Sequence, residues 1–245
     1  DGLLTVLRGV NTNPGADPED MVSIRLWIER DRIISTRRRR LLSVQDLKEQ
    51  LEQGLGPKTS GEFLSELIGR LADRIGEFVD TIEDALSSIE ESEADDSVQV
   101  RRMSLGGLRR QIASVRRFVA PQRDALDRLY RNPGSLLSDS ETDSLREEAD
   151  RVTRYLEDLD LARERAVVLQ EELMNELAQL QNTRMYVLSV VAAVFLPLTF
   201  VTGLLGMNVG GLPGIGSPRG FLIALVVMVA TSAVMLIYFR YRKWL

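Results

Sequence analysis

Short apolar segments separated by polar, turn-forming residues make up the first forty positions of the chain, which is the pattern of strands. The segments 3–9, 21–29 and 32–40 are short and rich in β-branched residues, and the turn-forming loop NTNPGADPED separates the first two. A short helix is predicted next over 43–54, with Ser43 as its N-cap and Gly54 at its end. The chain therefore opens with a partial sheet followed by a helix.

The pattern then changes to apolar residues at steps of three and four, which is typical of amphipathic helices. The segment 59–91 forms one such helix of about nine turns. The segment 98–132 forms another, and Pro133-Gly134 stops it. Residues 1–137 are therefore predicted to form an α/β head in which long helices cover the sheet.

A third helix is the longest, because neither proline nor glycine interrupts the chain from Ser138 or Ser140 until Pro197. Its apolar positions recur every seven residues, as in helices that pack along a seam. They are Leu145, Val152, Leu159, Ala166, Leu173 and Leu180. Continued to Gly206, the helix would be roughly 100 Å long at about 1.5 Å per residue. Residues 138–184 are therefore predicted to be a stalk rather than part of a compact core.

The stalk leads into two uncharged runs, 185–206 and 220–239, each long enough to cross a bilayer about 30 Å thick. Segment 207–219 joins them and carries one charge, Arg219, whereas the tail 240–245 carries three cations. The positive-inside rule then places the tail and the head in the cytoplasm and the joining loop outside. The predicted fold class is α+β with a membrane part: a cytoplasmic α/β domain, a stalk and two transmembrane helices.

The amino-acid composition excludes several functional classes for this chain. The 245 residues contain neither cysteine nor histidine, which excludes disulfides, thiolate or histidine metal sites and histidine-based catalysis within them. The net charge of −5 gives no support to nucleic-acid binding. Nothing in the chain predicts an enzyme or a bound cofactor. The chain also starts at Asp1 as if within a sheet, so a preceding N-terminal part is expected to be missing.

The first membrane run has one face of small, hydroxyl and weakly polar residues that could line a narrow pore. These residues follow one another by threes and fours and share about 120° of the helix. They are Asn182, Met185, Ser189, Ala193, Leu196, Thr199 and Gly203. Ordinary helix packing also favours small residues and hydroxyls, so both interpretations stay open. Two helices cannot enclose a pore alone, and transport would require an oligomer.

The segment PLTFVTGLLGMN (197–208), followed by a second apolar run and a basic tail, resembles the CorA family of divalent-cation transporters. Gly206, Met207 and Asn208 match that family's signature tripeptide. VGGLPG after it and ISTRRRRLL upstream look like the zinc-handling ZntB branch. The resemblance implies a homopentamer in a bacterial inner membrane, with a funnel-shaped head and five stalk helices lining the pore. It also implies Zn²⁺ as the transported ion, with Cd²⁺, Ni²⁺ and Co²⁺ as further candidates, and proton coupling. Five Asn208 amides would then form a ring at the outer mouth.

The loop after Asn208 lacks the acidic residues that magnesium-type members of the family usually carry there, which favours zinc. A magnesium or cobalt channel of the same architecture stays an alternative, as does a membrane-anchored coiled-coil scaffold that transports nothing. Three charged clusters are also weighed as sites. They are the acids of 90–96, Arg37–Arg40, and Asp17, Glu19 and Asp20. The favoured interpretations are, in turn, a solvated helix end, a strand end whose arginines pair with acids of the head, and an ordinary turn.

Overall fold

The computed structural model describes residues 2–92, 98–134, 136–207 and 219–241. Three strands, β1 (Leu3–Gly9), β2 (Val22–Ile28) and β3 (Ile33–Arg37), precede five helices. The helices are α1 (Leu42–Glu52), α2 (Ser60–Glu91), α3 (Val98–Arg131), α4 (Asp139–Leu205) and α5 (Gly220–Tyr241). The chain divides into two units, residues 1–174 and 175–245, and α4 contributes to both. The predicted fold class is confirmed, whereas the predicted boundaries at residues 137 and 184 stay predictions.

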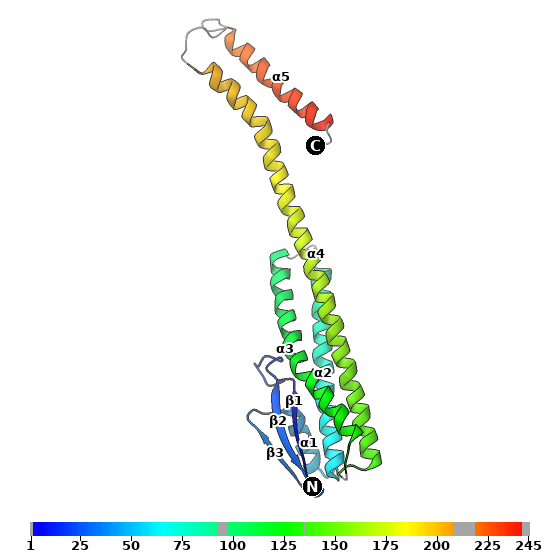
Figure 1. The fold of residues 1–245 in the computed structure, drawn as a ribbon. Helices are drawn as coiled ribbons and strands as arrows, with labels where there is room; N and C mark the ends of the chain where they lie inside the picture. The colour runs from blue at the N-terminus through cyan, green and yellow to red at the C-terminus, as the bar shows by residue number, and fades with distance from the viewer. Residues whose placement is uncertain (1, 93–97, 135, 208–218, 242–245) are drawn as a thin grey trace. The chain divides into compact units, whose positions relative to one another are not determined.

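In the first unit the strands form an antiparallel sheet in the order β1-β2-β3. Every second side chain of β2 lies on the buried face of the sheet. These residues are Val22, Ile24, Leu26 and Ile28. This face packs on the helices, and the approach is close at Gly9, where an added β-carbon would lie 2.6 Å from a methyl carbon of Leu71 in α2. Figure 1 shows α2, α3 and the first part of α4 side by side, with the sheet against their lower part.

Helix α2 supplies much of the core, as the three-and-four spacing predicts. Leu67, Leu71, Ile75 and Ile82 are almost completely buried. Helices α2 and α4 run in the same direction, because ion pairs join Asp73 to Arg151 and, further along both helices, Glu90 to Arg165. The chain reverses through α3, which is tied to α4 by the ion pair between Arg116 and Asp160 at 2.5 Å.

The predicted heptad seam of α4 is buried from Leu145 to Leu173. Leu180, the last predicted member, is 44% exposed and falls in the second unit, beyond the part of α4 that contributes to the core of the first. That Leu180 packs against another helix stays a prediction.

The predicted N-cap at Ser43 is wrong. Helix α1 begins at Leu42 after Leu41, and Ser43 is buried inside it. The Ser43 hydroxyl instead donates to the Arg70 carbonyl at 3.4 Å and accepts from Arg74 at 3.2 Å. Arg74 also binds Asp46 at 2.8 Å, so the serine belongs to a polar cluster between α1 and α2. The predicted helix end is correct, since Gly54 follows α1 with a φ of 74°.

Candidate functional site

The second unit contains the two long apolar segments. The C-terminal part of α4 and the whole of α5 are long and apolar enough to cross a membrane, with windows of mean hydropathy 2.3 and 2.6. Arg184 and Arg219 are the charged residues that bracket the first segment in the sequence. An uncharged helix of this length, not buried by the rest of the chain, is typical of a membrane span.

The predicted pore residues lie on a face of α4 that the chain leaves open. Met185 is 66% exposed and Leu196 is 71% exposed. Asn182, Ser189, Thr199 and Gly203 are also exposed, and Ala193 is partly buried at the edge of this face. We call these seven residues the polar face of α4. That this face lines a pore stays a prediction.

A second face of α4 is partly buried, and it carries Val190, Val194, Pro197 and Val201. At 100° per residue it is centred about 130° from the polar face. Helix α5 has a matching partly buried stripe at Ala224, Met228, Thr231 and Met235. One-sided burial on both helices is the pattern of two helices that face each other. The partly buried face of α4 is therefore a face other than the predicted pore face.

A third face of α4 carries large apolar side chains, Leu188, Val191 and Phe195, which are between 47% and 68% exposed. Such a face suits contact with lipid tails, since hydrocarbon neither competes for hydrogen bonds nor penalises apolar surface. Phe200 is an exception, because it is exposed but falls by helical spacing on the polar face. Phe200 is not among the predicted pore residues, and its position in the helical repeat is the one signal that places it on this face.

Backbone chemistry on the polar face provides oxygen atoms that a cation can use. Pro197 has no N–H, so the Ala193 carbonyl lacks the donor that a helix normally supplies four residues later. The Thr199 hydroxyl donates to the Phe195 carbonyl at 2.8 Å. Its proton is thereby engaged within the helix, and the lone pairs of its oxygen stay available as acceptors. These two positions offer neutral oxygen dipoles, the ligands that suit a hydrated hard cation.

Helix α4 ends just before the predicted signature tripeptide. The Gly206 N–H donates to the Thr202 carbonyl at 2.9 Å, and the Met207 N–H donates to Leu204 at 3.4 Å. The last carbonyls of a helix carry the negative end of its dipole, which favours a cation. Gly206 and Met207 therefore lie where carbonyl dipoles collect, whereas Asn208 lies outside the described residues.

Acidic metal ligands do not gather elsewhere in the described part of the chain, where no three Asp or Glu side chains come together as a metal site. Glu90, from the acidic segment considered as a regulatory site, is paired with Arg165, and residues 93–97 lie outside the described ranges. The arginine lowers the pKa of the Glu90 carboxyl by hydrogen bonding. In the loop before β2, Asp20 pairs with Arg39 at 3.4 Å, which fits the predicted surface ion pairs.

Comparison with known proteins adds the family context. A model of the family described as "CorA-like Mg2+ transporter protein" matches residues 1–242. The chain is 44% identical to the divalent cation transporter CmaX of Pseudomonas aeruginosa, over all of this chain and 74% of that protein. It is 36% identical to the zinc transport protein ZntB of Yersinia enterocolitica, over all of this chain and 75% of that protein.

Solved structures resemble the chain as well. The match to the full-length CmaX structure covers 99% of this chain and 75% of the CmaX chain. Its TM-score is 0.81 and the sequence identity is 42%. The magnesium transporter CorA of Methanocaldococcus jannaschii matches all of this chain and 78% of its own with a TM-score of 0.85. At 16% identity the second likeness shows a shared fold alone.

Proposed function

The chain belongs to the CorA-like family of divalent-cation transporters, and from that premise we propose that it transports zinc through a pore lined by the polar face of α4. The observation that carries this proposal is the three-faced character of α4 in the second unit. Its polar face is open, a second face matches the partly buried stripe of α5, and the third is large and apolar. A lipid-facing helix needs no uncovered polar face, whereas a pore-lining helix does.

The pore itself would need several copies of the chain. Two helices have too few faces to enclose a channel, so we propose the homopentamer that the family resemblance implies. In this assembly the polar faces of five α4 helices surround the axis and the α5 helices lie outside them. We further propose a bacterial inner membrane location with both termini in the cytoplasm, as the cation-rich tail favours.

The outer mouth is proposed to lie at Gly206, Met207 and Asn208. The helix-end carbonyls beside Gly206 give a negative dipole, and the Asn208 amide adds one oxygen per copy. A ring of such neutral oxygens can hold a divalent ion through its water shell, without removing that shell. This route suits a chain without histidine or cysteine.

Zinc is proposed as the main ion for two reasons. The relatives at 33–36% identity are named as zinc transport proteins, and the segment 209–218 contains no carboxylate to attract bare cations. Cd²⁺, Ni²⁺ and Co²⁺ are the further ions that such a site would pass. Magnesium is the second candidate, because the family description names Mg²⁺.

Ion flux into liposomes tests the proposal. Purified protein is reconstituted with a zinc-sensitive or a magnesium-sensitive dye inside, with and without a pH gradient. We expect zinc entry well above that of magnesium. Magnesium entry without zinc entry would show that magnesium, and not zinc, is the transported ion. Absence of flux for every divalent ion would overturn the proposal that the protein is a transporter. Zinc flux that ignores the pH gradient would remove proton coupling alone.

A further inference from the structure

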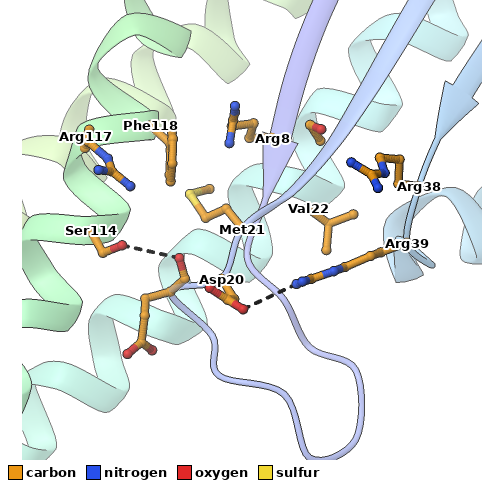
Figure 2. Close-up of a pocket in the computed structure, with 11 residues that line it drawn as sticks. Arg8, Asp20, Met21, Val22, Arg38, Arg39, Ser114, Arg117 and Phe118 are labelled. Carbon is orange, nitrogen blue, oxygen red and sulfur yellow. Dashed lines mark hydrogen bonds and ion pairs between the residues drawn. The ribbon is translucent and has the colours of Figure 1, made fainter.

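A second candidate site lies in the first unit, in a cavity of about 540 Å³ between the sheet and α3. Its walls come from four separate parts of the chain, three of which supply the four arginines that line it: Arg8 in β1, Arg38 and Arg39 after β3, and Arg117 in α3 (Figure 2). Glu19 and Asp20 supply its negative charge, so the lining carries two more cations than anions. The cavity is of the size that small-molecule ligands occupy.

Three of these arginines have no carboxylate partner among the described residues. Arg39 is paired with Asp20, but ion pairs to Arg8, Arg38 and Arg117 do not occur in that part of the chain. The two carboxylates of the lining balance only two of the four positive charges, so the cavity keeps a net positive charge that attracts an anion. This unbalanced convergence distinguishes the cavity from an ordinary charged surface, where arginines alternate with acids.

Phe118 holds two of the guanidinium groups in place. The Arg8 guanidinium carbon lies 4.0 Å from the centre of the Phe118 ring, and that of Arg117 lies 4.6 Å from it. Cation–π contacts of this kind fix the plane of a guanidinium while leaving its N–H groups to bind a ligand. Arg8 is also anchored through its backbone N–H, which donates to Gln122 of α3 at 2.7 Å. The guanidinium groups of Arg8 and Arg117 are therefore oriented before any ligand arrives.

We propose that this cavity, here named the arginine pocket, binds a soluble anion that carries one or more phosphate groups. Phosphate offers several charged acceptor oxygens in a fixed tetrahedron, and guanidinium forks bind such oxygens in pairs. The hydroxyls of Ser23 and Ser114 also line the cavity. Glu19 has a buried carboxylate oxygen without a hydrogen-bond partner among the described residues. This oxygen favours a phosphate compound that also carries a donor, such as a protonated phosphate oxygen or a hydroxyl.

The pocket is independent of the proposed pore, because it lies wholly in the first unit and shares no residue with the polar face of α4. A ligand there would join β1, the segment after β3, and α3. Since a ligand that binds only the folded state raises its stability, occupancy would also raise the melting temperature.

Calorimetric titration of the purified protein with pyrophosphate, at constant ionic strength, tests the proposal. We expect saturable binding that chloride does not reproduce, with a raised melting temperature. Arg38→Gln and Arg117→Gln should each lower the affinity for pyrophosphate about tenfold or more, because each substitution removes a charged hydrogen-bond donor. Arg110→Gln is the matched control, since Arg110 is an exposed arginine of α3 that does not line the cavity, and its affinity should stay within about twofold.

A short-chain phosphatidic acid forms the second arm of the titration and separates a lipid phosphate from a soluble one. Tighter binding of the lipid than of pyrophosphate would overturn the soluble ligand. Absence of saturable pyrophosphate binding, or equal affinity in wild type, Arg38→Gln and Arg117→Gln, would overturn the pocket. Circular dichroism of each variant confirms that it has folded, and the exposed Arg38 is the position at which folding is least at risk.

Discussion

The carboxylate of Glu141 in α4 lies against Gly61 of α2, in the space that a β-carbon on Gly61 would fill. Thr59, the N-cap of α2, donates its hydroxyl to one oxygen of this carboxylate. Ser138, just before α4, donates its backbone N–H to the other at 2.7 Å. One glutamate therefore links the starts of two parallel helices, and a glycine makes room for it.

We expect Gly61→Ala to destabilise the first unit by about 1–3 kcal/mol, the range for overpacking a well-filled site. The added methyl group must displace the Glu141 carboxylate, which weakens its bonds at both helix starts. The measurement is thermal or urea unfolding followed by circular dichroism.

Gly106→Ala in α3 is the matched control, because a β-carbon there meets nothing within 4 Å. Alanine should raise the stability at this helical position by about 0.5–1 kcal/mol. Equal effects of the two substitutions would show that helix propensity, and not the contact with Glu141, controls stability at Gly61.

The pH dependence of stability should differ in sign between Glu141 and Glu148, two turns apart on α4. The Ser138 backbone N–H and then the Thr59 hydroxyl lower the pKa of Glu141. Its contribution to stability is therefore present above the unfolded pKa and is lost as the pH falls through the folded value. Burial raises the pKa of Glu148, so its charged form costs stability, and this cost appears as the pH rises through the unfolded value toward the folded one.

Two substitutions separate these effects. Glu141→Gln should lower the free energy of unfolding by about 1 kcal/mol relative to wild type at pH 7, as the loss of a helix cap does. At pH 4 the loss should be smaller. The stability of Glu148→Gln relative to wild type should instead increase as the pH rises from 4 to 7. Unfolding measured at both pH values checks the pair, and parallel pH dependence of the two variants would contradict the opposite pKa shifts.

The sequence predicted the elements of the first unit well, because their signals are local. Short β-branched segments indicated the strands, and the three-and-four spacing predicted α2 and its buried leucines. It did not show that Gly61, Gly69 and Gly76 of α2 receive Glu141, Glu148 and Tyr155 of α4. These contacts join positions about eighty residues apart, and a glycine in a helix signals flexibility as readily as a close approach.

The two candidate sites differ in how far the sequence located them. The helical repeat was enough to define the polar face of α4, since all its members belong to one helix. The sequence does not predict the arginine pocket, because it indicates only a strand end at Arg37–Arg40 that pairs with acids of the head. Arg8, Arg38 and Arg117 come from three elements, so only the folded chain brings them together. Arg39 does form the expected surface pair, with Asp20.

Single cysteines should distinguish the faces of α4, because the chain has none of its own. We expect a charged, water-soluble thiol reagent to reduce zinc flux at least about fivefold in Thr199→Cys, since a thiol must contact water to ionise and react. Val194→Cys, on the partly buried face, is the matched control and should keep more than about half of its flux, because that face points away from the proposed pore and its water. Equal protection of both positions would remove Thr199 from the pore.

Asn208→Ala should reduce zinc flux about tenfold or more while the protein still folds and inserts into the membrane. Each copy loses one amide oxygen at the proposed outer mouth, and a symmetric ring loses all of them together, so a small change per copy is multiplied. Asn132→Ala, an exposed amide just after α3, is the control and should leave flux unchanged. The scaffold hypothesis makes the opposite prediction, because a chain that only anchors partners has no use for an amide at this position. Wild-type flux in Asn208→Ala would therefore remove the outer ring from the transport mechanism, and a loss of flux confined to zinc would identify Asn208 as part of ion selection.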